Sequence, residues 1–352
     1  MNFRTCLSSL PVLMLLPLSL FGKCPISPNG TLELRAPAGN LIVDTSGTDT
    51  VEVEVSNRQV TVQEDCQPNR VIIITKTPTV AGIPDWKIRV PRGVTLDLST
   101  QAGSIQVGDT DGSDAFLRTS GGKVTTGNIK GNALIYATEV KTGDIGGNAE
   151  LRGLGGRLRV GDVGGNAEFV TTGGDITTGL IRGRVKATSQ SGSITIRESN
   201  GDVIVTTLEG DITSNYIHGA FDGRTESGNI RLEGVGSWVH ALTGVGDIFV
   251  RLIPEKLGGD LHVNAEAALG NITMYVPLKM KATIDAIIDK PAMKTKQIFS
   301  DFPFKAAIKA PINGLRSLIP GGPEQQGVVL NGGGNNVKLR TSAGTIHIMK
   351  GN

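Results

Sequence analysis

The 352-residue sequence has few aromatic residues, few cysteines and no large excess of positive or negative charge. Aromatic side chains make up 4% of it, with two Trp and three Tyr. So few rings disfavour a wide core and the aromatic platforms that carbohydrate enzymes use. The net charge is only +2 and the basic residues are scattered along the chain, which argues against nucleic acid as a partner.

The sequence also lacks the 3.6-residue apolar period of helices. Gly is abundant, at 48 residues, and at this density it would cost about 1 kcal/mol per residue in helix interiors. The glycines are periodic instead, because six 18-residue units align without a gap from Gly147 to Pro254. Their tenth places are Gly156, Gly174, Gly192, Gly210, Gly228 and Gly246, and their twelfth places are Leu158, Ile176, Ile194, Ile212, Ile230 and Ile248. A fixed period of this length predicts a chain wound into stacked coils.

Within each unit, places 3, 5, 12 and 14 are mostly apolar and their neighbours are polar. Alternation with a period of two predicts two short strands, each with one buried face. The Gly at place 10 lies between them, where it can supply a corner with positive φ, and an Asp, Asn or Ser that suits a turn often follows it. Place 7 predicts a ladder of hydroxyl groups along the stack, formed by Thr171, Ser189, Thr207, Thr225 and Thr243.

We therefore predict an all-β fold, a single-stranded parallel β-helix (β-solenoid) with about 18 residues per coil. It should be right-handed, because parallel crossovers nearly always take that hand. The regular solenoid is expected over residues 94–276, with irregular β coils or a cap over 23–93 and a last coil over 331–352.

Residues 277–330 break the repeat with six prolines and with Phe299, Phe302 and Phe304. This insertion is either an exposed arm that grips a partner or a flap whose Phe side chains close the end of the core. We favour the flap, because the open end of a coil stack needs a cover.

The N-terminus predicts a secretory signal over residues 1–22. Arg4 precedes the apolar run Leu10–Phe21, which is too short for a comfortable transmembrane helix. No other segment could span a membrane. We expect an exported protein, located in the periplasm, the outer envelope or at the cell surface.

Export would place Cys24 and Cys66 in an oxidising compartment, which allows a disulfide between them. Two unpaired thiols are the alternative. Cys24 also invites a lipid anchor, but Lys23 stands where a small residue is expected before a lipidated cysteine.

Several segments resemble a known family. They are GTLEL from Gly30, AGNLIV from Ala38, WKIRVPRGVTL from Trp86, the Ser/Thr-Gly-Asx/Ser-Ile repeats, and NGGGNNVKLRTSAGTIHI from Asn331. In this order they resemble the bacterial putative-adhesin family of β-strand-repeat proteins, a domain of unknown function. The resemblance covers nearly all of the mature chain. It implies an exported β-solenoid, and it supplies no catalytic residues.

The sequence shows no convincing catalytic, calcium or metal pattern. Acids recur at place 11, as Asp175, Asp211 and Asp247, but turn chemistry explains them. His218, His240 and His262 are 22 residues apart in a coil of 18, so they cannot stack into one metal site. The outward Thr residues at place 13 are too interrupted to match an ice lattice. We expect no catalytic residues, no cofactor and no metal.

These observations predict a non-catalytic, adhesin-like binding or structural module that presents repetitive polar faces to a surface or partner. The partner would be an envelope protein or a surface glycan. The first alternative is a periplasmic accessory or sensor protein that docks an envelope partner. A carbohydrate-active β-helix enzyme is the second alternative.

Overall fold

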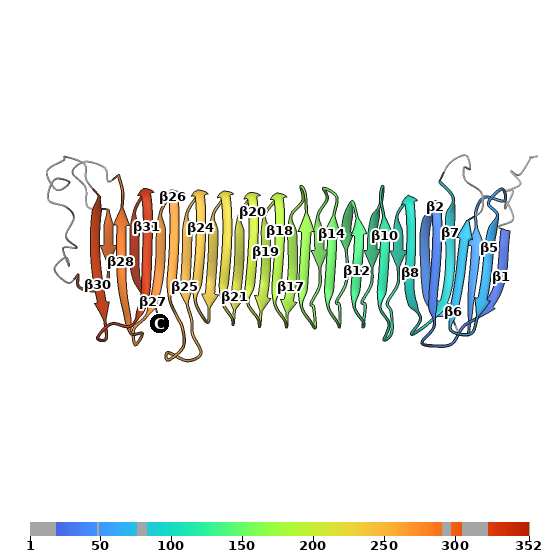
Figure 1. Cartoon of the computed structure of the whole chain (residues 1–352), viewed down its shortest axis with the longest axis horizontal. Coiled ribbons are helices and arrows are strands. Elements are labelled where there is room, and N and C mark those ends of the chain that lie inside the picture. The colour runs from blue at the N-terminus through green and yellow to red at the C-terminus, as the bar shows by residue number, and fades with distance from the viewer. Residues whose placement is uncertain (1–18, 48, 76–82, 291–296, 305–322, 352) are drawn as a thin grey trace, which may run out of the picture.

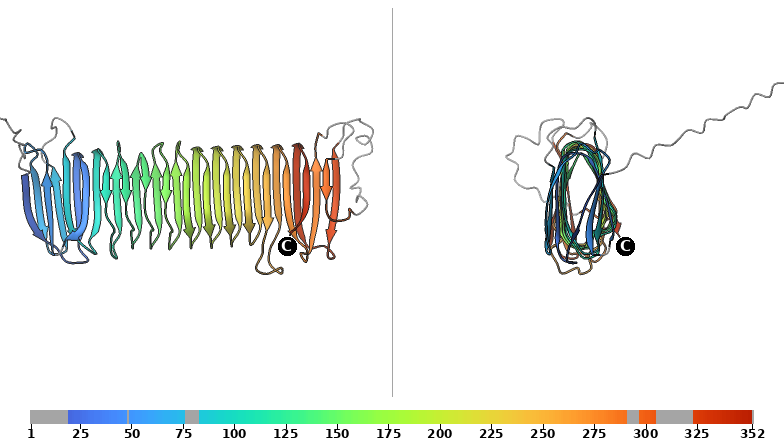
Figure 2. Two further views of the ribbon diagram at one scale, coloured as in Figure 1. Left: turned by 180° about the vertical axis from the view of Figure 1, so that it is seen from behind. Right: turned by 90° about the vertical axis from the view of Figure 1, so that its right-hand side faces the viewer.

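The computed structural model describes residues 19–47, 49–75, 83–290, 297–304 and 323–351. These residues contain no helix and form two parallel-stranded sheets of 16 strands each, with antiparallel pairs at their ends. Figure 1 shows a rod whose strands run across the long axis. The end-on view in Figure 2 shows a flattened ring with the two sheets facing each other. The predicted β-solenoid is confirmed, and its right-handed winding stays a prediction.

Sheet 1 consists, in spatial order, of β1 (Ser19–Pro25), β4 (Thr50–Val55), β7 (Asp85–Pro91), β3 (Asn40–Gly47), β9 (Ile105–Val107), β11 (Lys123–Thr126), β13 (Glu139–Lys141), β15 (Leu158–Val160), β17 (Ile176–Ile181), β19 (Ile194–Ser199), β21 (Ile212–Ile217), β23 (Ile230–Val235), β25 (Ile248–Leu252), β27 (Ile272–Pro277), β32 (Ile346–Gly351) and β29 (Ile298–Ser300).

Sheet 2 consists, in spatial order, of β30 (Glu324–Leu330), β28 (Ala282–Ile288), β31 (Asn335–Ala343), β26 (Val263–Leu269), β24 (Val239–Val245), β22 (Phe221–Ser227), β20 (Val203–Glu209), β18 (Val185–Ser191), β16 (Ala167–Thr171), β14 (Ala149–Gly153), β12 (Ala133–Ala137), β10 (Ala115–Thr119), β8 (Thr95–Ala102), β2 (Thr31–Ala38), β6 (Arg70–Thr75) and β5 (Val62–Gln67).

The core lies between the sheets and consists of several parallel columns of mostly aliphatic side chains, one column for each inward place. Ile194 pairs with Ile212, and Ile212 with Ile230, so neighbouring coils are related by 18 residues. All six side chains at place 12 are at most 1% exposed. Places 3, 5 and 14 are also buried, as the alternation predicts. Place 5 is a glycine at Gly223, because the ring of Phe221 fills the space its side chain would need.

The glycines at place 10 allow the backbones of neighbouring coils to approach closely. A Cβ on Gly174 would overlap the carbonyl oxygen of Gly156, and a Cβ on Gly228 would overlap that of Gly210. Gly210 also has a φ of 129°, in the region that favours glycine. The stack therefore selects glycine by contact between coils as well as by corner geometry.

The predicted hydroxyl ladder is present inside the rod. Thr207 is fully buried, and its Oγ1 donates to the carbonyl oxygen of Gly192 in the preceding coil at 3.1 Å. The other members that donate to the place-10 carbonyl of the preceding coil are Thr171, Ser189, Thr225 and Thr243. The ladder satisfies carbonyl groups at the corner, where the regular strand pairing is interrupted.

The acids at place 11 lie at the corners between strands, as expected of turn residues, and they also form a second ladder between coils. Asp211 Oδ1 accepts the backbone N–H of Asn229 at 2.7 Å, and Asn229 Oδ1 accepts that of Asp247 at 2.8 Å. Side-chain oxygens of Asp175 and Asp247 do the same for the residues that follow them in the stack. These carboxylates serve backbone pairing between coils.

Both ends of the rod interleave segments that are distant in sequence. At the N-terminal end, β2 and β3 lie between the pair β6 and β7 and the pair β8 and β9. At the other end, β31 lies between β26 and β28, and β32 lies between β27 and β29. The C-terminal coil is therefore last in the chain but not last in the rod (Figure 1).

The insertion 277–330 supplies the outermost strands, β28, β29 and β30. Phe302 is 8% exposed and Phe304 packs against the core. Phe299 lies outside, 40% exposed, with its ring centroid 4.9 Å from that of His347. These contacts support the flap over the arm. Residues 305–322 lie outside the described residues.

The predicted signal segment falls largely outside the described residues, which begin at Ser19. β1 starts there and pairs antiparallel with β4. The expected boundary after residue 22 would therefore fall within β1. Signal cleavage stays a prediction.

Candidate ligand-binding groove

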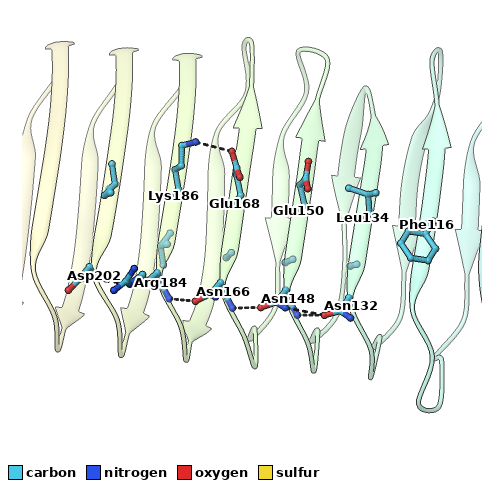
Figure 3. A pocket seen from close by; sticks show the side chains of 15 residues that line it. Phe116, Asn132, Leu134, Asn148, Glu150, Asn166, Glu168, Arg184, Lys186 and Asp202 are labelled. Carbon is cyan, nitrogen blue, oxygen red and sulfur yellow. Dashed lines mark hydrogen bonds and ion pairs between the residues drawn. The ribbon is translucent and has the colours of Figure 1, made fainter.

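A groove of about 690 Å³ lies on the outer face of sheet 2. It crosses the strands from β10 to β20, as Figure 3 shows. Each strand contributes one outward side chain to the floor, and the residues just before β12, β14, β16, β18 and β20 form the rim. A ligand in the groove would lie along the rod axis, over about 24 Å if the strands are ~4.8 Å apart.

The floor is one row of side chains with mixed character. In-register pairing sets Phe116, Leu134, Glu150, Glu168, Lys186 and Ile204 in single file on adjacent strands. The apolar members lie at the two ends of the row and the charged members in the middle. The row can therefore contact the apolar and the polar edges of one extended ligand.

The rim of the groove is a ladder of amide side chains (Figure 3). The Oδ1 atom of Asn148 accepts the backbone N–H of Asn166 at 2.8 Å, and Oδ1 of Asn132 accepts that of Asn148 at 2.8 Å. Asn166 accepts the backbone N–H of Arg184 at 2.9 Å. Each carbonyl side is held by the backbone, so the ladder fixes these exposed side chains in one orientation.

A second hollow, of about 290 Å³, adjoins the groove at Phe116 and Leu134. Its floor includes Tyr136, whose ring lies 5.0 Å from the guanidinium of Arg118 and 5.7 Å from that of Arg152. A tyrosine flanked by two arginines is a typical ligand-contacting group, because it offers a flat ring and charged donors together.

The charged groups of the groove are paired with one another. Glu150 accepts hydrogen bonds from Arg152 at 3.1 Å and from the Tyr136 hydroxyl at 3.2 Å. The bond with Glu150 raises the pKa of Arg152. Glu168 pairs with Lys186 at 3.1 Å. Glu150 and Glu168 thus each have a basic side chain beside them.

The two predicted site cysteines lie at the N-terminal end, away from the groove. The structure joins Cys24 of β1 to Cys66 of β5 in a disulfide, with Cα atoms 5.4 Å apart. Together with Glu64 they are the group of the described residues that could hold a metal ion. The disulfide engages both sulfur atoms, so this group offers a metal no thiolate.

The three histidines singled out in the sequence do not come together. His218 lies between Glu255 at 3.1 Å and Glu198 at 3.3 Å. His240 contacts Asp222 at 3.0 Å. His262 pairs with an aspartate and stacks on a tryptophan ring, and these partners are Asp260 and Trp238. The expectation that they do not stack into one site is confirmed.

Sequence reasoning missed the groove. Phe116 and Leu134 of the groove, and Tyr136 of the adjoining hollow, belong to the two coils before the regular repeat. A signal existed, because these residues are large and fall at outward places. Recognising it required alignment of coils that differ in length.

The family model described as Toastrack DUF4097 matches residues 32–251. The chain belongs to this family. The match confirms the family resemblance and includes every strand that lines the groove, and it ends before the segment that starts at Asn331. No curated protein matched this Toastrack chain.

Solved structures similar to this Toastrack protein share little sequence with it. A putative adhesin from Bacteroides fragilis is 15% identical, covering 68% of this chain and 98% of that one, with a TM-score of 0.33. A putative adhesin from Parabacteroides distasonis is 14% identical over 74% and 97%, with a TM-score of 0.30. A putative cell adhesion protein from Clostridium sporogenes is 10% identical over 95% and 100%, with a TM-score of 0.17.

Proposed function

We propose that this Toastrack protein is a non-catalytic, adhesin-like binding module that is exported and holds an extended ligand in the groove on sheet 2. The observation that carries the proposal is the continuous row from Phe116 to Ile204 beside a fixed rim of asparagines. A rigid stack keeps these groups in place before a ligand arrives, which lowers the entropic cost of binding.

The groove offers both apolar and polar contacts, which suits a ligand with apolar faces and polar edges, such as a glycan chain. Phe116 and Tyr136 offer rings, and the asparagine rim offers amide donors. Both groups suit a sugar, whose ring faces are apolar and whose edges carry hydroxyls.

The groove is tested with a double variant, Phe116→Ser with Leu134→Ser. Labelled wild-type protein should bind a subset of surface polysaccharides on a glycan array, and this variant should bind them at least about tenfold more weakly. The matched control is Leu208→Ser with Leu269→Ser, which removes two exposed side chains outside the groove. Equal binding by the two double variants would contradict the proposal, as would release of reducing ends from a bound glycan.

The proposed export is tested separately, by protease treatment of intact cells. Among the described residues, no helix is long and apolar enough to cross a membrane. Release of the protein by external protease would support a surface-exposed adhesin. Full protection until the envelope is opened would instead support a periplasmic accessory protein.

A further inference from the structure

The outer face of sheet 1, opposite the groove, carries a row of side chains that contains no carboxylate. In-register pairing from β13 to β27 sets one outward residue per strand in single file. In spatial order the row is Lys141, Arg159, Thr177, Thr195, Thr213, Arg231, Phe249 and Thr273. It spans about 34 Å if the strands are ~4.8 Å apart. We call it the basic row.

Two like charges lie side by side at the start of the basic row. Lys141 of β13 pairs directly with Arg159 of β15, and within the described part of the chain neither side chain has an ion-pair partner. Nearby arginines do have partners, since Arg157 contacts Asp175 and Arg197 contacts Asp162. Like charges opposite each other destabilise a sheet. An anionic group bound between them would remove that repulsion.

The other end of the basic row is a cluster of arginines and aromatic rings. The guanidinium of Arg231 lies 4.5 Å from the ring centroid of Phe249, and that of Arg251 lies 4.9 Å from that of Tyr275. The two ring centroids are 5.6 Å apart. Both arginines share one acid, Glu233. Aromatic and arginine side chains are the groups most enriched at the centres of binding surfaces.

We propose that the basic row binds an acidic polysaccharide chain lying along the rod. The ends of the row supply cations for carboxylate or sulfate groups, with arginine forks suited to paired oxygens. The three threonines between them offer hydroxyls at each strand, and Phe249 offers a ring face. Binding to a lipid surface would require more exposed apolar side chains, and Phe249 is the one large apolar side chain of the row. This face is separate from the groove, so the two proposals can fail independently.

The test measures binding of the mature protein to polygalacturonate at low ionic strength. We expect binding that weakens as salt rises, no binding to neutral dextran, and none to phosphatidylglycerol vesicles. Lys141→Gln with Arg159→Gln should weaken binding about tenfold. Thr195→Glu, which places an acid at the centre of the row without removing a base, should weaken it comparably. The groove variant, Phe116→Ser with Leu134→Ser, should bind polygalacturonate as the wild type does.

The matched control is Arg224→Gln with Lys338→Gln, which removes the same charge from sheet 2 outside the groove. It should bind polygalacturonate as the wild type does. Equal losses in the two charge variants would show a general charge effect and overturn the assignment. Unaltered binding by Thr195→Glu, preference for the vesicles, or no polygalacturonate binding at low salt would overturn it as well. Circular dichroism of each variant shows whether the sheets are retained.

Discussion

The internal hydroxyl ladder can be tested by comparing two buried hydroxyl groups, one with a hydrogen-bond partner and one without. Thr207 Oγ1 lies 3.1 Å from the carbonyl oxygen of Gly192 and 3.0 Å from that of Glu209. Ser214 is 2% exposed, but its hydroxyl has no hydrogen-bond partner among the described residues. Both side chains lie in the middle of the rod, in consecutive strands of one coil, β20 and β21.

Thr207→Val keeps the shape of the side chain and removes the donor. A buried carbonyl then loses a hydrogen bond, which costs about 1–2 kcal/mol. Ser214→Ala removes a hydroxyl that is already unsatisfied, so its loss should leave stability unchanged or raise it by up to about 1 kcal/mol. The two substitutions should therefore change the free energy of unfolding by different amounts. The changes should have opposite signs if the unpartnered hydroxyl of Ser214 destabilises the protein.

The assay is urea unfolding followed by circular dichroism. With a slope of roughly 3 kcal/mol per molar, a loss of 1–2 kcal/mol lowers the midpoint by about 0.3–0.7 M. Long repeat arrays can depart from two-state unfolding, so amide hydrogen exchange of this coil gives a local measure. A Thr207→Val protein as stable as the wild type would refute the ladder's role. So would a Ser214→Ala protein less stable than Thr207→Val.

Three further substitutions test the core, the glycine corners and the disulfide. Ile212→Asp places an unpaired charge at a fully buried position and should abolish the β circular dichroism signal of the middle coils at 25 °C. Ile204→Asp, at a position that is 51% exposed, should keep that signal. Equal spectra would mean that Ile212 does not face inward. The Cβ of Gly228→Ala would overlap the carbonyl oxygen of Gly210, so this variant should lower the free energy of unfolding by about 1–3 kcal/mol. Gly258→Ala, which has open space around it, should leave it unchanged. Identical melting temperatures for the two variants would contradict this. Cys66→Ser removes a disulfide that links residues 42 apart and should lower the stability of the N-terminal end by about 2–4 kcal/mol. Thiol titration of the unreduced mature protein should find no free cysteine, and two titrating thiols would contradict the disulfide.

The repeat made the middle of the rod predictable from sequence. Ile194, Ile212 and Ile230 recur at one place with no insertions between them, so a single period fixes both their neighbours and their burial. The hydroxyl ladder followed from the same alignment, because buried hydroxyls at one place in every coil have the same carbonyl beside them.

The interleaved ends could not be predicted in this way. The backbone N–H of Leu261 donates to the side chain of Asn335, 74 residues later, because the C-terminal coil enters the stack beside β26. A period identifies which segments are coils but not the order in which distant coils stack. The acids at place 11 do lie at the turns, but their hydrogen-bond partners lie in the next coil and could not be predicted from one coil alone.

The groove and the basic row also depend on neighbours across coils. Lys141 and Arg159 are 18 residues apart in the sequence, where they look like scattered charges. Pairing between β13 and β15 places them side by side. The net charge of the whole chain, +2, conceals this local concentration.

Removal of one complete coil tests the central claim, that an 18-residue repeat builds the rod, most directly. A variant lacking residues 184–201 should keep the register, with β20 beside β16 in sheet 2 and β21 beside β17 in sheet 1. It should fold with the wild-type circular dichroism spectrum and a rod about 4.8 Å shorter by X-ray scattering. Deletion of residues 184–192, half a coil, should break the pairing and unfold the middle of the protein. Two deletion variants of equal stability, or an 18-residue deletion that fails to fold, would contradict the account.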